Sequence, residues 1–144
     1  LKNERGIMSY SQNLLKLLGI KLANELTKTD LASNERVFRA ILIQALEDAM
    51  SSSKFKRETY WKHDAHRWFL ENSQDFQEIC WSADLDTEFI RGEYMRLLKE
   101  RKIFFSKMQA AWVDYRELYK MYRNAKDKEE RRRIKSLIDK IKFN

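Results

Sequence analysis

Apolar residues recur at three- and four-residue spacing along most of the chain, which is the pattern of amphipathic helices. This spacing predicts a first helix over residues 9–26, with Leu14, Leu18 and Leu22 on one face. A second helix is expected over residues 35–50. Its apolar residues cover nearly the whole circumference, so we expect it at the centre of a helical bundle.

Polar breaks separate the predicted helices. Ser33 or Asn34 is expected to cap the second helix, and Asn72 or Ser73 a later one, because their side chains accept hydrogen bonds from free backbone N–H groups. The remaining helices are expected over residues 54–70, over 74–83, and from 87 to about 123 with a bend near Lys102. The third of the predicted helices, 54–70, should bury Trp61, Ala65, Trp68 and Phe69.

The last part of the chain carries an apolar seam. Its members are spaced four, three, four, three and four residues apart, as in a coiled coil: Phe104, Met108, Ala111, Tyr115, Leu118 and Tyr122. After a break near residues 124–126, Asp127 and Glu130 resemble a capping box that opens a final helix. The short connection predicts an antiparallel helical hairpin. The aliphatic residues of the final helix are too few to cover the seam, so a homodimer is also expected.

Composition supports an all-α fold. The 144 residues include no Pro and three Gly, and 43% are hydrophobic. We expect a single helical domain in which residues 1–95 contain a helix-turn-helix at about 75–95 and residues 96–144 form a basic, aromatic-rich hairpin. The single Cys fits a reducing compartment, and no apolar stretch is long enough to span a bilayer, so a cytoplasmic protein without a membrane partner is expected.

The net charge of +7 is unevenly distributed along the chain. Residues 1–70 carry +4, residues 71–95 carry −6, and residues 96–144 carry +9. A strongly basic segment indicates a polyanionic partner, whereas the acidic middle does not. Solvated charges on the surface of a hairpin are the alternative explanation for the basic segment.

Residues 75–91 have the pattern of a helix-turn-helix, in which two helices cross through a short turn. Cys80 is the small residue expected at the crossing, and Asp84 occupies the turn position where glycine is usual. Aspartate adopts the left-handed conformation more readily than most residues. Asp86 is the expected N-cap of the second helix. A structural corner without a DNA role is the alternative.

This stretch resembles a "DF-x-x-VC-x-x-AGLDP-x-x-VR" pattern of small phage and prophage-type bacterial proteins. The matching residues are Phe76-x-x-Ile79-Cys80-x-x-Ala83-x-Leu85-Asp86-x-x-x-Ile90-Arg91. The resemblance covers about residues 36–95 and implies a helix-turn-helix fold with a role in DNA binding or phage-type gene control. It departs from the pattern at Asp84, where the family has Gly, and at Thr87, where it has Pro.

The predicted DNA contacts fall into two groups. On and after the second helix of the motif they are Thr87, Arg91, Arg96, Lys99, Arg101 and Lys102; on the final helix they are Arg131, Arg132, Arg133 and Lys135. Arg91 suits a guanine edge and Thr87 a phosphate or base. Nearby acids, among them Asp86 and Glu88, would repel phosphates.

No catalytic or metal site is predicted. His63 and His66 are three residues apart, but with Cys80 they give only three ligands, and a structural zinc site needs four. No cofactor is expected. We therefore expect a DNA-binding transcriptional regulator whose partners are double-stranded DNA, a second copy of the chain and the transcription machinery. The alternative is a helical protein–protein interaction module, an adaptor or inhibitor, with no nucleic-acid role.

Overall fold

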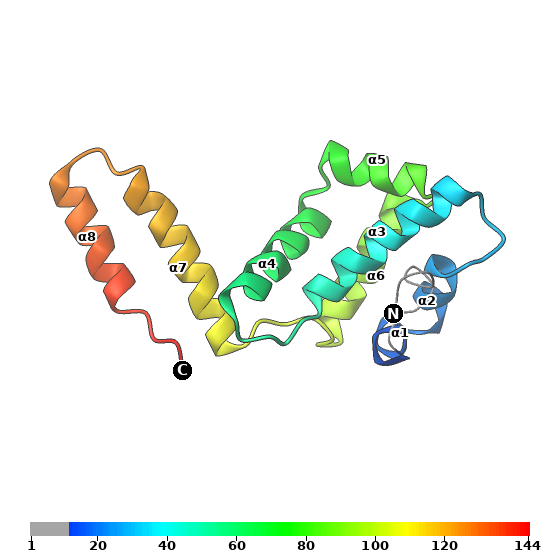
Figure 1. The fold of residues 1–144 in the computed structure, drawn as a ribbon, viewed down its shortest axis with the longest axis horizontal. Coiled ribbons are helices and arrows are strands. Elements are labelled where there is room, and N and C mark those ends of the chain that lie inside the picture. Colours follow the sequence, from blue (N-terminus) through cyan, green and yellow to red (C-terminus); the bar gives the residue numbers. More distant parts are fainter. Residues whose placement is uncertain (1–11) are drawn as a thin grey trace. The chain divides into compact units, whose positions relative to one another are not determined.

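The computed structural model describes residues 12–144, and over these residues it contains eight helices and no strand (Figure 1). The helices are α1 (Gln12–Leu18), α2 (Ile20–Leu26), α3 (Ser33–Ala49), α4 (Lys56–Glu71), α5 (Gln74–Ser82), α6 (Thr87–Lys99), α7 (Lys107–Arg123) and α8 (Lys128–Asp139). The all-α prediction is confirmed. The predicted start of the first helix, at residues 9–11, lies outside the described residues.

The helices belong to two compact units. The first contains α1 to α3 and residues 64–104, and the second contains residues 51–63 and 105–144. Helix α4 therefore contributes its first half to the second unit and its second half to the first. The ranges 1–95 and 96–144 expected from the sequence divide the chain at a different place, since residues 96–104 lie in the first unit and 51–63 in the second.

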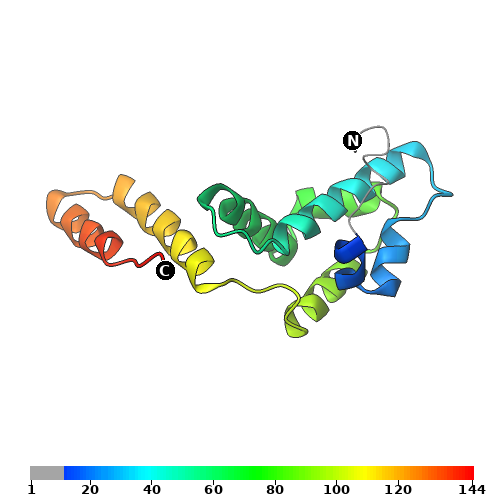
Figure 2. The same cartoon turned by 60° about the horizontal axis from the view of Figure 1, so that its bottom comes forward.

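The first unit is built around α3 and α6. Leu42, Ile43 and Leu46 of α3 are buried, and α3 packs on α2 and α5. Phe69 of α4 stacks on Tyr94 of α6, with ring centroids 4.4 Å apart and an angle of 14° between the rings. Figure 2 shows α1 and α2 beside α6. These contacts form one continuous apolar core.

The first predicted helix is interrupted at Gly19. This residue has φ 90° and ψ 156°, a conformation that is essentially restricted to glycine. Helix α1 therefore ends at Leu18 and α2 begins at Ile20. The break allows Leu18 and Leu22, on two separate short helices, to enter the same core.

Helix α3 is less central than its composition predicts. Val37 and Ile41 remain 48% and 40% exposed, whereas the side chain of Arg39 is only 3% exposed. Neither Ser33 nor Asn34 caps the helix. It begins at Ser33, two residues before the predicted start, and its N-cap is Ala32, which makes no side-chain hydrogen bond.

The buried face of α4 changes along its length. Ala65 and Phe69 are buried in the first unit, as predicted, but Trp61 is exposed. Trp61 lies in the half of α4 that belongs to the second unit, where Thr59 and Lys62 are the buried residues. A single apolar stripe therefore does not describe this helix.

The long helix predicted from residue 87 to 123 is two helices. After α6, Arg101 adopts φ 61°, and the amides of Arg101 and Lys102 bond to the carbonyls of Leu98 and Leu97 at 3.1 and 2.9 Å. This is the Schellman ending of a helix. Ser106 and Gln109 then form a capping box that opens α7. The expected bend near Lys102 is a complete break.

The second unit contains the predicted hairpin. Helices α7 and α8 lie antiparallel, side by side (Figure 1), and bury Ala111, Ile134 and Ile138. Asp127 caps α8 by accepting a bond from the backbone amide of Glu130 at 2.8 Å, which is one half of the predicted capping box. The Glu130 carboxylate accepts from the amide of Lys126 at 3.1 Å instead of that of Asp127. The ring of Phe143, beyond α8, lies 4.2 Å from that of Trp112.

A buried polar cluster joins α4 to α7 in the second unit. Lys62 Nζ donates to Ser51 O at 2.7 Å and to Gln109 Oε1 at 3.0 Å, and it lies 4.8 Å from the centroid of Phe105. The side-chain Nε2 of Gln109 donates to Ser51 O and Ser53 O, both at 2.9 Å. Burial lowers the pKa of Lys62 to about 8.

Gly19→Ala should lower the free energy of unfolding by about 1–3 kcal/mol, because a Cβ is strained at this backbone conformation. Gly92→Ala is the matched control. Gly92 lies inside α6 with no neighbouring atom within 4 Å of an added Cβ, so this change should raise stability by about 0.5–1 kcal/mol. Urea unfolding followed by circular dichroism measures both. Equal effects of the two changes would contradict this account of Gly19.

Lys62 should make stability depend on pH in the alkaline range. The pKa of Lys62 is about 8 in the folded protein against 10.5 normally, so between these values the unfolded chain binds more protons and the folded state gains stability as pH rises. In urea unfolding from pH 8 to 10, the wild type should gain stability relative to Lys62→Met. The exposed Lys54→Met is the control, and a constant difference between wild type and Lys62→Met would refute the expectation.

Candidate nucleic-acid interface

Helices α5 and α6 are joined by the tight turn that the sequence predicts. Ser73 caps α5 by accepting a bond from the amide of Phe76 at 3.2 Å, and Asp86 caps α6 by accepting one from Glu88 at 3.1 Å. Asp84 has φ 60°, the left-handed conformation expected at this position. The amides of Asp84 and Leu85 bond to the carbonyls of Trp81 and Cys80, both at 2.9 Å. The turn is therefore a second Schellman ending.

The buried side chain of Arg39, from α3, donates hydrogen bonds to the backbone of this turn. Its Nε donates to Ala83 O at 2.9 Å and its Nη2 to Asp84 O at 3.3 Å. Its Nη1 donates to the carbonyl of Glu25 and lies 3.5 Å from the Glu25 carboxylate. The sequence prediction missed this role. The available signal was a single arginine within the most apolar stretch of the chain.

Arg91, the predicted base contact, is directed into its own unit. Its Nη2 donates to the carbonyl of Leu70, at the end of α4, at 3.1 Å. Its Nε is buried and has no hydrogen-bond partner among the described residues. The guanidinium thus satisfies a carbonyl at a helix C-terminus, where a positive charge is also favoured by the helix dipole.

Arg96 is held in the same way. Its Nη2 donates to Leu18 O at 2.7 Å and to Glu93 Oε1 at 2.9 Å, and its Nη1 to Glu100 Oε1 at 3.0 Å. Leu18 is the last residue of α1, where carbonyls have no partner within the helix. Arg96 therefore fastens α1 to α6.

The other predicted contacts near α6 are weakly placed for phosphate binding. Thr87 is half-buried at the first turn of α6, between the exposed Asp86 and Glu88. Lys99 is exposed, Arg101 covers the ring of Phe104 at 5.1 Å, and Lys102 lies 3.7 Å from Glu100. All of these residues belong to the first unit, whereas the predicted contacts on α8 belong to the second.

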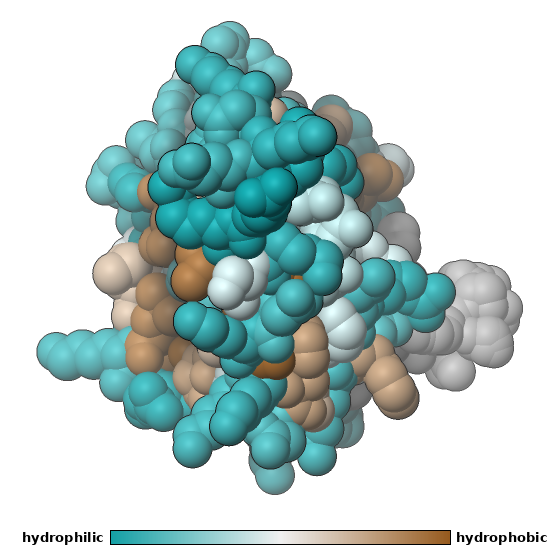
Figure 3. Space-filling view, turned by 90° about the vertical axis from the view of Figure 1, so that its left-hand side faces the viewer, coloured by the Kyte–Doolittle hydropathy of each residue, from teal (hydrophilic) through white to brown (hydrophobic). Residues whose placement is uncertain are grey.

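Helix α8 carries a run of three consecutive arginines. Arg131, Arg132 and Arg133 are all exposed. Tyr122 of α7, residues of α8 and the C-cap of α8 line a groove of about 530 Å³. The residues of α8 are Lys128, Arg131, Arg132, Lys135, Ser136 and Asp139, and the C-cap is Lys140. We call this the α8 groove. The part of the molecule that carries the hairpin is mostly hydrophilic on the face shown in Figure 3.

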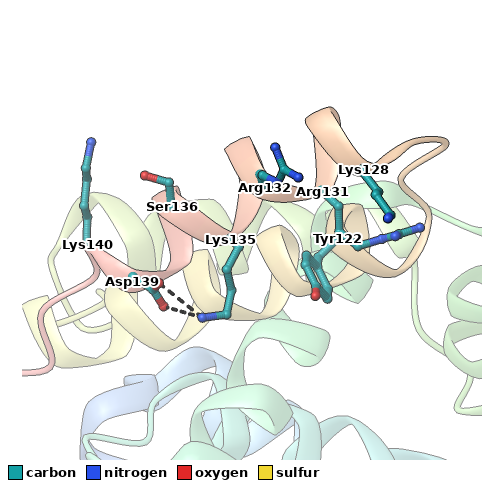
Figure 4. A pocket seen from close by; sticks show the side chains of 8 residues that line it. All are labelled: Tyr122, Lys128, Arg131, Arg132, Lys135, Ser136, Asp139 and Lys140. Atoms are coloured by element: carbon teal, nitrogen blue, oxygen red, sulfur yellow. Dashed lines mark hydrogen bonds and ion pairs between the residues drawn. The ribbon is translucent and has the colours of Figure 1, made fainter.

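One acidic residue belongs to the α8 groove. Lys135 Nζ lies 3.0 Å from Asp139 Oδ1, and this neighbour raises the pKa of Lys135 (Figure 4). Figure 4 also shows that Arg132 and Lys140 point to the side opposite Lys135. Cations therefore lie on two sides of α8, and one of them, Lys135, is paired with Asp139.

The two structural units separate the charges of the chain. The segments of the first unit, residues 1–50 and 64–104, hold 13 basic and 15 acidic residues, a net charge of −2. The segments of the second, 51–63 and 105–144, hold 16 basic and 7 acidic residues, a net charge of +9. The positive charge of the protein thus belongs to the unit that contains α7 and α8.

The residues considered for metal or nucleophilic chemistry have packing roles. His66 Nδ1 lies 2.7 Å from the hydroxyl of Tyr94, and the ring of His63 meets the ring of Phe105 edge-on at 6.4 Å. Cys80 is fully buried, and burial raises the pKa of its thiol to about 12. Within residues 12–144 no group of three or more His, Cys, Asp or Glu side chains could hold a metal ion.

No protein-family model matches this chain, and neither the curated proteins nor the solved structures contain a significant match. In the described part of the chain, no helix is both long and apolar enough to cross a membrane. The surface chemistry of the two units is therefore the basis for any functional assignment.

Arg91→Ala tests whether this residue reads DNA or holds α4. We expect a lower melting temperature and unchanged affinity for the best duplex selected from a random pool, because the guanidinium is bound to Leu70 O. If Arg91 met a base edge, the substitution would instead cost about 1–3 kcal/mol of binding free energy on that duplex. Thermal unfolding and fluorescence anisotropy at constant salt distinguish the two results.

Proposed function

We propose that this protein binds double-stranded DNA through the exposed cations of α8. The observation that carries the proposal is the separation of charge, with +9 in the second unit and −2 in the first. A surface of this kind gains affinity by releasing the counterions condensed on phosphates. Since phosphate contacts carry little sequence information, this part of the interface would bind duplexes of any sequence.

Helix α6 has a smaller part in this proposal than in the sequence prediction. Arg91 and Arg96 already bond to backbone carbonyls, and acidic residues surround Thr87. Sequence preference would then have to come from the remaining exposed residues near α6, such as Lys99. A role in transcription regulation, with the transcription machinery as a partner, is supported only by the resemblance of residues 76–91 to phage-type proteins.

A homodimer remains part of the proposal. The reason for expecting it, a seam that α8 alone cannot cover, is weaker in the structure. Residues of α7 beside the seam already contact residues 51–63 in the same unit: Trp112 Nε1 donates to Lys54 O at 3.1 Å, and Arg116 Nη1 to Tyr60 O at 3.3 Å. These contacts cover part of the surface that α8 alone would leave open.

A protein-interaction module is the second candidate function, and one observation favours it. Val37 and Ile41 are one turn apart on α3 and both remain exposed. Exposed apolar residues on one helix face are typical of a docking surface for another protein. Failure to bind any duplex at low salt would move this candidate ahead.

Arg131→Gln, Arg132→Gln and Arg133→Gln combined should weaken binding to all duplexes alike. The slope of log affinity against log salt should become shallower by about 0.9 for each phosphate that the protein no longer neutralises. The matched control changes Lys16, Lys21 and Lys28 of the first unit to Gln, which removes the same charge from a different exposed surface. Fluorescence anisotropy with random duplex across a salt series measures both. Equal losses of affinity in the two variants would show an effect of net charge alone and would contradict an α8 site.

A further inference from the structure

A second groove lies in the second unit, between the first half of α4 and α7. Its volume is about 500 Å³, within the range of sites that hold small ligands. Three tyrosines and four cations line it: Tyr60, Tyr115, Tyr119, Lys56, Arg116, Lys120 and Arg123. We call it the tyrosine groove. The combination of planar rings and positive charges suits a ligand that is both aromatic and anionic.

The rings of this groove belong to a longer series along α7. The centroids of Trp112 and Tyr115 are 5.7 Å apart, those of Tyr115 and Tyr119 5.4 Å, and those of Tyr119 and Tyr122 5.7 Å. Tyr119 is 38% exposed and Tyr115 and Tyr122 are half-buried. The spacing that predicts a packing seam therefore also leaves ring surface accessible to solvent.

Cations hold and flank these rings. Arg116 lies 4.6 Å from the ring centroid of Tyr60 and donates to its carbonyl, which fixes this residue of α4 against α7. Arg123 lies 5.8 Å from the centroid of Tyr119. Lys120 has an exposed carboxylate neighbour, Glu117, at 3.7 Å, a pair that water largely screens.

We propose that the tyrosine groove binds an unpaired nucleic-acid strand, whose bases stack on Tyr115 and Tyr119 and whose phosphates meet Lys56, Lys120 and Arg123. Stacking on aromatic side chains is accessible to single strands because their base faces are open, and it tolerates any sequence. A duplex hides these faces, so it cannot use the tyrosines in this way.

The length of the ring series favours a strand over a free nucleotide. It continues past the tyrosine groove to Tyr122, which also lines the α8 groove together with Lys128 and Arg131. The stacking surface and the basic surface are thus adjacent within one unit. The inference does not depend on duplex binding by α8, because the tyrosines and their cations are a different set of residues.

The test uses fluorescence anisotropy of the whole chain with labelled dT12. Tyr119→Leu should weaken binding about fivefold or more, the lower limit for loss of one stacked base. Tyr119→Phe retains the ring and should stay within about twofold of the wild type. Trp61→Leu removes an exposed aromatic ring of the same unit that does not line the groove, and it too should have little effect. Circular dichroism melting verifies that each variant is folded.

Three results would overturn the inference. Unchanged dT12 binding by Tyr119→Leu would show that the ring is not a stacking platform. Competition by thymidine monophosphate as strong as that by unlabelled dT12 would indicate a site for a single nucleotide. Loss of a dimer in Tyr119→Leu during sedimentation, with dT12 binding retained, would assign the rings to a second copy of the chain.

The same variants separate this inference from duplex binding. Tyr119→Leu should leave binding to a duplex of equal length unchanged. If dT12 binding depends on Tyr119 while no duplex binds, the proposal for α8 fails and the tyrosine groove stands. If the α8 arginines control duplex binding while Tyr119→Leu leaves dT12 binding unchanged, the proposal for the tyrosine groove fails and the proposal for α8 stands.

Discussion

The first unit depends on one buried cation. The cost of burying the Arg39 guanidinium is offset by hydrogen bonds to the carbonyls of Glu25, Ala83 and Asp84 and by an ion pair with the Glu25 carboxylate. A buried charge is costly unless it is paired and hydrogen-bonded, so the surrounding backbone must stay where these bonds can form. The carbonyls in turn come from the end of α2 and from the turn after α5, where helices leave acceptors unsatisfied. One side chain of α3 thereby positions both the end of α2 and the turn between α5 and α6.

The second unit uses the same principle with different groups. Lys62 and Gln109 direct their N–H groups to the carbonyl of Ser51, and Gln109 also reaches that of Ser53. Basic residues of this protein therefore fall into two kinds. Some, such as Arg39 and Lys62, donate hydrogen bonds to backbone carbonyls inside their unit. The others, on α8 and around the tyrosine groove, face solvent. Net charge alone does not distinguish them, and only the second kind can contribute to binding a polyanion.

The sequence predicted those features that depend on neighbouring residues. The caps Asp86 and Asp127 are confirmed, as is Ser73, one of two candidates, because a cap needs only the next helical turn. The cap of α3 was predicted wrongly because the helix begins earlier than its apolar pattern indicates. The break after α6 was underestimated because Arg101 is an unusual residue for a left-handed position. For the candidate interface, the exposed arginines of α8 follow from a local amphipathic pattern. The roles of Arg91 and Arg96 do not, since their acceptors lie 21 and 78 residues away in the chain.

The shared helix α4 has a consequence for how the basic unit comes into being. Its two segments, 51–63 and 105–144, are separated in the chain by residues 64–104 of the first unit. A fragment consisting of residues 96–144 alone would contain α7 and α8 but neither Lys62 nor Tyr60, which complete the buried polar cluster and the tyrosine groove. During synthesis, Lys62 and Tyr60 emerge long before α7 does. The tyrosine groove can therefore form only after residues 64–104 of the first unit and then α7 have been synthesised.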